Sequence, residues 1–91
     1  MLLHRPTIIL NPVSAGGRTH RNQEAILQAI RQHVNNGFVL KITQTPHDAT
    51  NIAVEAVAKG CELIIAVGGD GTIQEVVNGL LAQDENKNYR L

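Results

Sequence analysis

The strongest constraint on the fold is a run of five apolar residues, 63–67, that leads directly into the turn Gly68-Gly69-Asp70-Gly71-Thr72. A short, mostly β-branched run of this kind is typical of a parallel-sheet strand covered on both faces. After the turn, apolar residues recur at helical spacing: Ile73, Val76, Val77, Leu80 and Leu81. The sequence therefore predicts a buried strand that passes through a glycine turn into the N-terminus of a helix.

The composition of this turn favours an anion as its ligand. Gly68, Gly69 and Gly71 permit positive φ and close approach to the backbone. A helix N-terminus adds free N–H groups and the positive end of the helix dipole. Asp70 must then bind a metal, accept a hydrogen bond from a hydroxyl group, or be held by backbone donors. The alternative is a plain strand-to-helix turn with Thr72 near the cap.

Two well-known nucleotide loops are absent from the sequence. No Gly-x-x-x-x-Gly-Lys-Ser/Thr motif occurs. The Gly-x-Gly-x-x-Gly motif fails because Gln74 stands at its third glycine, counting from Gly69. Walker-type and dinucleotide-binding Rossmann loops therefore lose support.

Strand and helix patterns alternate along the chain. Strands are predicted at residues 7–10, 38–43 and 63–67, and helices at 22–34, 49–59 and 72–81. Gly37 and Gly60 end the first two helices, and Asp48 is the expected N-cap of the second. Strict alternation implies an α/β fold, a three-layer α/β/α sandwich of Rossmann-like type with a parallel sheet and right-handed crossovers.

Three loops are expected at the ligand-binding end of this sheet. Ligands of parallel α/β sheets bind at the carboxyl ends of the strands, where loops 11–18, 43–48 and 68–72 lie. The second strand alternates apolar and polar residues, which indicates a less covered edge position. Residues 82–90 are polar, and the alternation predicts a fourth strand after Leu91. We interpret residues 1–91 as one incomplete domain, truncated after the third strand–helix unit.

Composition excludes several function classes. The chain has eight basic and eight acidic residues, and its aromatic residues are Phe38 and Tyr89. It therefore offers a nucleic acid neither a net positive charge nor aromatic side chains on which bases could stack. The four histidines lack paired ligand spacing, which argues against zinc, and no residue is assigned as a metal ligand. A single cysteine, no signal peptide and no long apolar span indicate a cytoplasmic location. Cys61 is expected to be a small core residue rather than a nucleophile.

Three segments carry a more specific signal together than any of them does alone. They are Asn11-Pro12-Val13-Ser14-Ala15-Gly16, Thr43 followed by Pro46-His47-Asp48-Ala49, and Gly68-Gly69-Asp70-Gly71-Thr72-Ile73-Gln74-Glu75-Val76-Val77-Asn78-Gly79-Leu80. Together they resemble the catalytic domain of the diacylglycerol kinase family, which includes bacterial lipid kinases and sphingosine and ceramide kinases. Gly-Gly-Asp-Gly alone also occurs in NAD kinases and phosphofructokinases. The match continues through Glu75 and Asn78-Gly79, and this longer match favours the diacylglycerol kinase family.

The resemblance implies a set of ATP-binding residues. Asn11, Pro12, Ser14 and Thr43 would hold the nucleotide from the first two loops. The third loop and its helix would contact the phosphates and ribose through Gly69, Asp70, Gly71, Thr72, Gln74 and Glu75. Asp70 would have a supporting catalytic role, orienting a hydroxyl or joining a metal and water network, and is not assigned as the base. Two residues depart from the family pattern, Ala15 in place of glycine and Gln74 in place of asparagine.

The implied reaction is in-line transfer of the ATP γ-phosphoryl group to a lipid hydroxyl, of diacylglycerol or sphingoid type, with Mg²⁺. Family members continue into a second domain that carries the proposed base and much of the lipid site. This chain alone is therefore expected to be inactive, and the full protein is expected in the cytoplasm or peripheral at a membrane. The sequence does not specify the acceptor lipid.

Three alternatives remain open from the sequence. One is a kinase similar to NAD kinase or phosphofructokinase, with a soluble acceptor, which the Asn-Pro loop disfavours. Another is a nucleotide-binding regulatory module without catalysis, consistent with Ala15 and Gln74. The third is a homo-oligomer formed through an exposed sheet edge.

Overall fold

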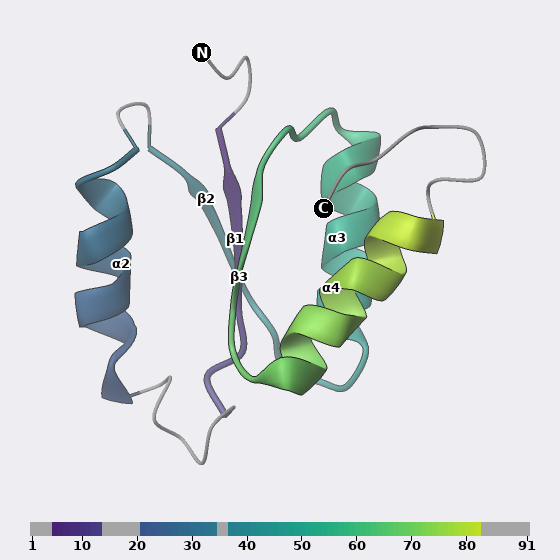
Figure 1. Cartoon of the computed structure of the whole chain (residues 1–91), viewed down its shortest axis with the longest axis horizontal. Helices are drawn as coiled ribbons and strands as arrows, with labels where there is room; N and C mark the ends of the chain where they lie inside the picture. The colour runs from purple at the N-terminus through teal and green to yellow at the C-terminus, as the bar shows by residue number, and fades with distance from the viewer. Residues whose placement is uncertain (1–4, 14–20, 35–36, 83–91) are drawn as a thin grey trace.

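A computed structural model describes residues 5–13, 21–34 and 37–82 of the chain. Three parallel strands, β1 (Thr7–Leu10), β2 (Val39–Ile42) and β3 (Ile64–Val67), form a sheet in the order β2-β1-β3. Helix α2 (Gln23–Arg31) lies on one side of this sheet, and α3 (Asp48–Ala58) and α4 (Asp70–Ala82) lie on the other (Figure 1). The predicted three-layer α/β/α arrangement is confirmed.

The first strand of the chain is the middle strand of the sheet. Ile8, Ile9 and Leu10 are each 0% exposed. Since side chains alternate between the two faces of a strand, Ile9 faces α3 and α4, where it packs with Ala49, Ala53 and Val76, while Ile8 and Leu10 face the opposite layer. The core is therefore built around β1 from both sides.

The third strand is less covered than its sequence predicts. All four residues of β3 are only partly buried, although residues 63–67 were expected to be enclosed on both faces. The physical reason is the strand order, because β1 occupies the enclosed position and, among the described residues, β3 has a neighbour on one side only. The edge position predicted for the second strand is confirmed, since two of the four residues of β2 are exposed and β1 is the only strand beside it in the described part of the chain.

Two helix boundaries differ from the prediction by two residues or more. Helix α2 ends at Arg31 rather than near Val34, and a tighter turn follows in which the His33 N–H donates to the Ile30 carbonyl at 2.9 Å. Helix α4 begins at Asp70, two residues before the predicted start, which places the Asp70 carboxylate at the positive end of the helix dipole. None of the helices within the described residues has the length and apolar character needed to cross a lipid bilayer.

Helices α3 and α4 pack closely where α4 carries a glycine. A Cβ on Gly79 would lie 2.6 Å from the Thr50 carbonyl oxygen and 3.0 Å from the Cβ of Ala53. The Thr50 hydroxyl also donates to the Glu75 carbonyl at 2.7 Å. These contacts fix α4 against α3, and so fix the turn that precedes α4 relative to the loop that precedes α3.

Candidate functional site

The carboxyl ends of the three strands meet at one edge of the sheet. The Asn11 N–H donates to the Val67 carbonyl at 2.9 Å, and the Thr43 N–H donates to the Leu10 carbonyl at 2.9 Å. The hydrogen-bonded ladder thus continues one residue past β1 and β2. This continuation brings the three loops predicted to form the site to the same place.

The side chain of Asn11 joins the first loop to the third. Its Nδ2 donates to the Thr72 hydroxyl oxygen at 3.1 Å, and its Oδ1 accepts a hydrogen bond from the Val13 N–H at 3.2 Å. Thr72 is only 3% exposed. Asn11 and Thr72 therefore position the two loops, and Asn11 also shapes its own loop as an Asx turn.

In the third loop, Gly68 is required for space, and the glycines at 68, 69 and 71 do not adopt positive φ. Among the described glycines, positive φ occurs at Gly37 and Gly60, so residues 68, 69 and 71 do not use the positive φ that glycine permits. A Cβ on Gly68 would lie 2.5 Å from the Thr72 hydroxyl oxygen, whereas a Cβ on Gly71 would have no atom within 4 Å. Gly68 therefore makes room for Thr72, and Gly71 borders open space.

The free backbone N–H groups of the turn belong to residues 69–71, within the expected stretch 69–72. The N–H groups of Thr72 and Ile73 both donate to the Gly69 carbonyl, at 3.0 and 3.2 Å. Within residues 5–13, 21–34 and 37–82, the N–H groups of Gly69, Asp70 and Gly71 have no backbone acceptor. Donors for an anion are therefore found at residues 69–71, and the Thr72 amide is engaged internally.

The second loop is folded by Asp48. Its Oδ2 accepts hydrogen bonds from the N–H groups of Gln44 (2.7 Å) and Thr45 (2.9 Å), and its Oδ1 accepts one from the Thr45 hydroxyl at 2.8 Å. These bonds, the one from the Gln44 N–H first, lower the pKa of Asp48 below its ordinary value. The predicted N-cap role is wrong, because α3 begins at Asp48 itself after His47, whose φ is +72°.

Glu75 connects α4 to this second loop. Its Oε1 accepts a hydrogen bond from the His47 N–H at 2.6 Å and lies 4.0 Å from the His47 Nδ1. The resemblance implied a nucleotide contact for Glu75, and in the structure this carboxylate already holds a backbone donor. Its side chain remains 30% exposed, so one edge of it faces solvent.

A pocket of about 210 Å³ lies between the first and second loops. Its lining comes from β1 and β2 loop residues and from α4: Asn11, Val13, Thr43, Gln44, Thr45, Pro46 and Glu75. The structure thus brings together three of the predicted site residues, Asn11, Thr43 and Glu75. Sequence reasoning missed Val13 and the stretch 44–46, although the Thr45-Pro46-His47-Asp48 turn pattern could have indicated the latter.

The other predicted site residues do not line this pocket. They are Pro12, Gly69, Asp70, Gly71, Thr72 and Gln74, of which Asp70, Gly71 and Gln74 are exposed on the first turns of α4. Ser14 and the departing residue Ala15 lie outside the described residues. In the part of the chain that the structure describes, no three His, Cys, Asp or Glu side chains are grouped closely enough to hold a metal ion.

The fold and this edge of the sheet define a parallel α/β domain with a polar pocket and free helix-start amides at the ends of its strands. The sequence profile of the diacylglycerol kinase catalytic domain matches residues 5–90. The chain belongs to that family, which confirms the resemblance seen in its three motifs.

Individual relatives agree with this assignment. The chain is 40% identical to the diacylglycerol kinase of Bacillus subtilis (strain 168) over 82 residues, which cover 90% of this chain and 27% of the relative. It is 27% identical to the mitochondrial acylglycerol kinase of Homo sapiens, covering 93% of this chain and 20% of the relative.

A solved structure gives the same result for the fold. A diacylglycerol kinase from Bacillus anthracis str. Sterne superimposes with a TM-score of 0.71 at 32% identity, covering 82% of this chain and 27% of that one. The chain therefore spans about a quarter of the length of these bacterial kinases.

Proposed function

We propose that this chain is the ATP-binding part of a lipid kinase. In the whole protein, the γ-phosphoryl group of ATP would pass to a hydroxyl of diacylglycerol or a sphingoid lipid, with Mg²⁺ supplying charge neutralisation at the phosphates. Membership of the family supports the kinase class. The observation that carries the nucleotide proposal is the open space over Gly71 beside amides that have no backbone acceptor.

The residues of this chain would bind and orient the phosphates. The N–H groups of residues 69–71 and the positive end of the α4 dipole stabilise negative charge at this point. Asp70 is exposed there and would provide one carboxylate oxygen to Mg²⁺, which usually takes one or two carboxylates together with phosphate oxygens. Asn11 and Thr72 act indirectly, since their hydrogen bond holds the first and third loops in place.

Other steps of the kinase reaction are assigned to parts of the whole protein outside this chain. The region shared with this chain is 27% of the Bacillus subtilis relative and 20% of the human one, and we assign lipid binding and proton removal to residues elsewhere in the whole protein. We accordingly expect no phosphoryl transfer by this chain alone. The whole protein would work in the cytoplasm and reach its lipid at a membrane surface. Family membership favours this over the NAD kinase and phosphofructokinase alternative with a soluble acceptor.

The nucleotide proposal is tested by titrating the chain with a non-hydrolysable ATP analogue and Mg²⁺ in a calorimeter. Gly71→Ala adds a methyl group to open space within α4, so the variant should be at least as stable as the wild type. The same methyl group would occupy the volume given to the phosphates, and we expect affinity to fall about tenfold or more. Equal affinities for the wild type and Gly71→Ala would contradict the proposal.

Two acidic residues provide a matched pair. Asp70 and Glu24 are both exposed, and each lies in the first turn of a helix, α4 and α2 respectively. Asp70→Asn should weaken binding of the Mg²⁺ complex about threefold or more by the loss of one charged ligand, while Glu24→Gln should not. Assays of the whole natural protein with diacylglycerol, sphingoid bases and NAD then identify the acceptor. Transfer to NAD alone would overturn the lipid assignment.

A further inference from the structure

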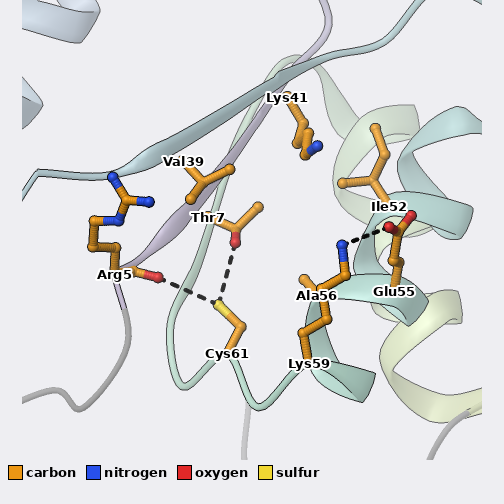
Figure 2. A pocket seen from close by; sticks show the side chains of 9 residues that line it. All are labelled: Arg5, Thr7, Val39, Lys41, Ile52, Glu55, Ala56, Lys59 and Cys61. Carbon is orange, nitrogen blue, oxygen red and sulfur yellow. Dashed lines mark hydrogen bonds and ion pairs between the residues drawn. The ribbon is translucent and has the colours of Figure 1, made fainter.

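A second pocket lies at the opposite end of the sheet, at the amino ends of the strands. It has a volume of about 260 Å³ and lies between the sheet and helix α3 (Figure 2). No residue of the candidate nucleotide site lines it. The three sequence motifs contribute nothing to it either, so the kinase assignment leaves this pocket unexplained.

The pocket arises from the register of β1 and β2 and from small residues of α3. Thr7 and Val39 are register partners, and Lys41 follows Val39 on the same face of β2 because side chains alternate. Helix α3 covers this face with Ala56, whose methyl group leaves the space unfilled. Thr7 is only 7% exposed and forms a polar floor.

Cationic side chains surround the pocket. Arg5, Lys41 and Lys59 line it together with one carboxylate, Glu55. The Lys59 ammonium donates to the Glu55 Oε1 at 2.8 Å, and this bond, with the charges of Lys59 and Lys41, lowers the pKa of Glu55. In the described part of the chain, Arg5 and Lys41 form no ion pair. The pocket therefore carries an excess of positive charge in a chain whose net charge is zero.

The interior of the pocket is mostly apolar. Val39, Ile52 and Ala56 form its walls. The polar groups inside are the Thr7 hydroxyl and the Cys61 thiol, whose Sγ lies 3.4 Å from the Thr7 Oγ1 and donates to the Leu63 carbonyl at 3.1 Å. An apolar interior with cations at its rim is complementary to a ligand that has an anionic head and a short apolar body.

We propose that this pocket binds a small amphipathic phosphate monoester. At roughly 30 Å³ for each water-sized group, its volume accommodates about nine such groups, which is the size of butyl phosphate. The anionic head lies between Arg5 and Lys41, and the alkyl body lies against Val39 and Ile52. Such a group can come from a free metabolite or from the headgroup of a phosphorylated lipid.

The proposal is tested by nuclear magnetic resonance titration of the ¹⁵N-labelled chain. Butyl phosphate should bind about tenfold more tightly than either inorganic phosphate or butanol, because each of these lacks one half of the recognised chemistry. The affected amides should be those of Thr7, Val39 and Cys61. Butanol binding as tightly as butyl phosphate, or shifts confined to other regions, would overturn the proposal.

Charge-removing variants provide the control for general electrostatic attraction. Arg5→Gln and Lys41→Gln should each weaken binding about threefold or more, and both side chains are exposed, so folding should be retained. Arg21→Gln removes an exposed cation outside the pocket and should leave the affinity unchanged. An equal loss with Arg21→Gln would show attraction to the whole chain and not to this pocket.

Cys61 gives an independent readout because it is the single cysteine of the chain. Butyl phosphate should slow the reaction of Cys61 with iodoacetamide, a neutral reagent, and Lys41→Gln should raise the concentration that gives half-maximal protection about threefold or more. An unchanged alkylation rate would contradict occupancy of the pocket. Vesicles of phosphatidylcholine with and without phosphatidate show whether the phosphate group comes from a lipid or from a free metabolite. Protection of Cys61 by phosphatidate vesicles alone indicates a lipid headgroup. Protection by butyl phosphate alone indicates a free ligand.

Discussion

The two ends of the sheet differ in how their polar groups are used. At the carboxyl ends of the strands, the side chains of Asn11, Asp48 and Glu75 each hold a hydrogen-bond partner in a neighbouring loop or element. At the amino ends, the cations Arg5 and Lys41 border a pocket without forming an ion pair in the described part of the chain. At the carboxyl ends, polar side chains are used to hold loops in place. At the amino ends, two cations are left available for a ligand.

This difference shows how one small parallel sheet can present two chemically distinct sites. At the carboxyl end, the chain turns from strand to helix, and polar side chains form the hydrogen bonds that shape the loops. Backbone N–H groups at the start of the helix are then available to bind a ligand. At the amino end, helix α3 and the edge strand β2 leave a hollow whose character is set by side chains alone.

The largest expected effect removes the core that both ends share. Ile9→Ala deletes a fully buried side chain of the middle strand, and we expect a loss of roughly 2–5 kcal/mol in the free energy of unfolding. Ile65→Ala, on the half-buried edge strand β3, should lose less than half as much. Urea unfolding followed by circular dichroism measures both, and equal losses would contradict the central role of β1.

A smaller effect is expected where α3 meets α4. Gly79→Ala places a methyl group 2.6 Å from the Thr50 carbonyl oxygen, so the helices must separate. We expect a net loss of about 1–3 kcal/mol, although alanine favours a helix by about 1 kcal/mol over glycine. Gly71→Ala, in open space on the same helix, is the control in thermal unfolding. A more stable Gly79→Ala variant would show that the helices are not in contact at this point.

The next effect concerns the carboxyl end alone and depends on pH. Because hydrogen bonds lower the pKa of Asp48 in the folded state, its stabilising contribution is complete above the unfolded value near 3.8 and is lost as the pH falls through the folded pKa. Asp48→Asn should therefore be less stable than the wild type at neutral pH, and this difference should shrink in acid. Urea midpoints at pH 7 and pH 3 measure it, with Glu24→Gln as the control. A difference that grows in acid would contradict the assignment.

The smallest effect on stability is expected at the amino end. Glu55 and Lys59 form an exposed pair at i, i+4, so Glu55→Gln should leave the urea midpoint unchanged within error. The same variant removes the one carboxylate of the cationic pocket and should raise its affinity for butyl phosphate about two- to threefold. Weaker binding of butyl phosphate by Glu55→Gln would count against charge as the basis of recognition.

Features that depend on short stretches of sequence were predictable. The alternation of strands and helices, the parallel sheet and the meeting of three loops at one edge follow from local patterns of apolar residues and glycines. Motif resemblance correctly indicated that Asn11, Thr43 and Glu75 lie together at that edge. Their ATP-binding role, and that of the residues on the first turns of α4, stays a prediction.

Features that depend on which strands are neighbours were not predictable from such patterns. The sequence assigned full burial to residues 63–67, and the structure gives it to β1, because strand order is set by the packing of the whole sheet. Asp48 was expected to cap α3 and instead binds the loop before it, since the His47 backbone at positive φ changes the direction of the chain. The second pocket combines residues 5, 41, 59 and 61, which no local motif connects.

The order β2-β1-β3 has a consequence for how the protein is made. The ribosome synthesises the middle strand, β1, before its two partners. These partners, β2 and β3, begin only at Val39 and Ile64. The side chains of Ile8, Ile9 and Leu10, which are fully buried in the folded chain, therefore stay in contact with water, or with chaperones, until β2 and β3 have emerged. Because both pairings join distant segments, formation of the sheet should be slow compared with formation of the helices, and exposure of β1 during translation is the step most open to aggregation.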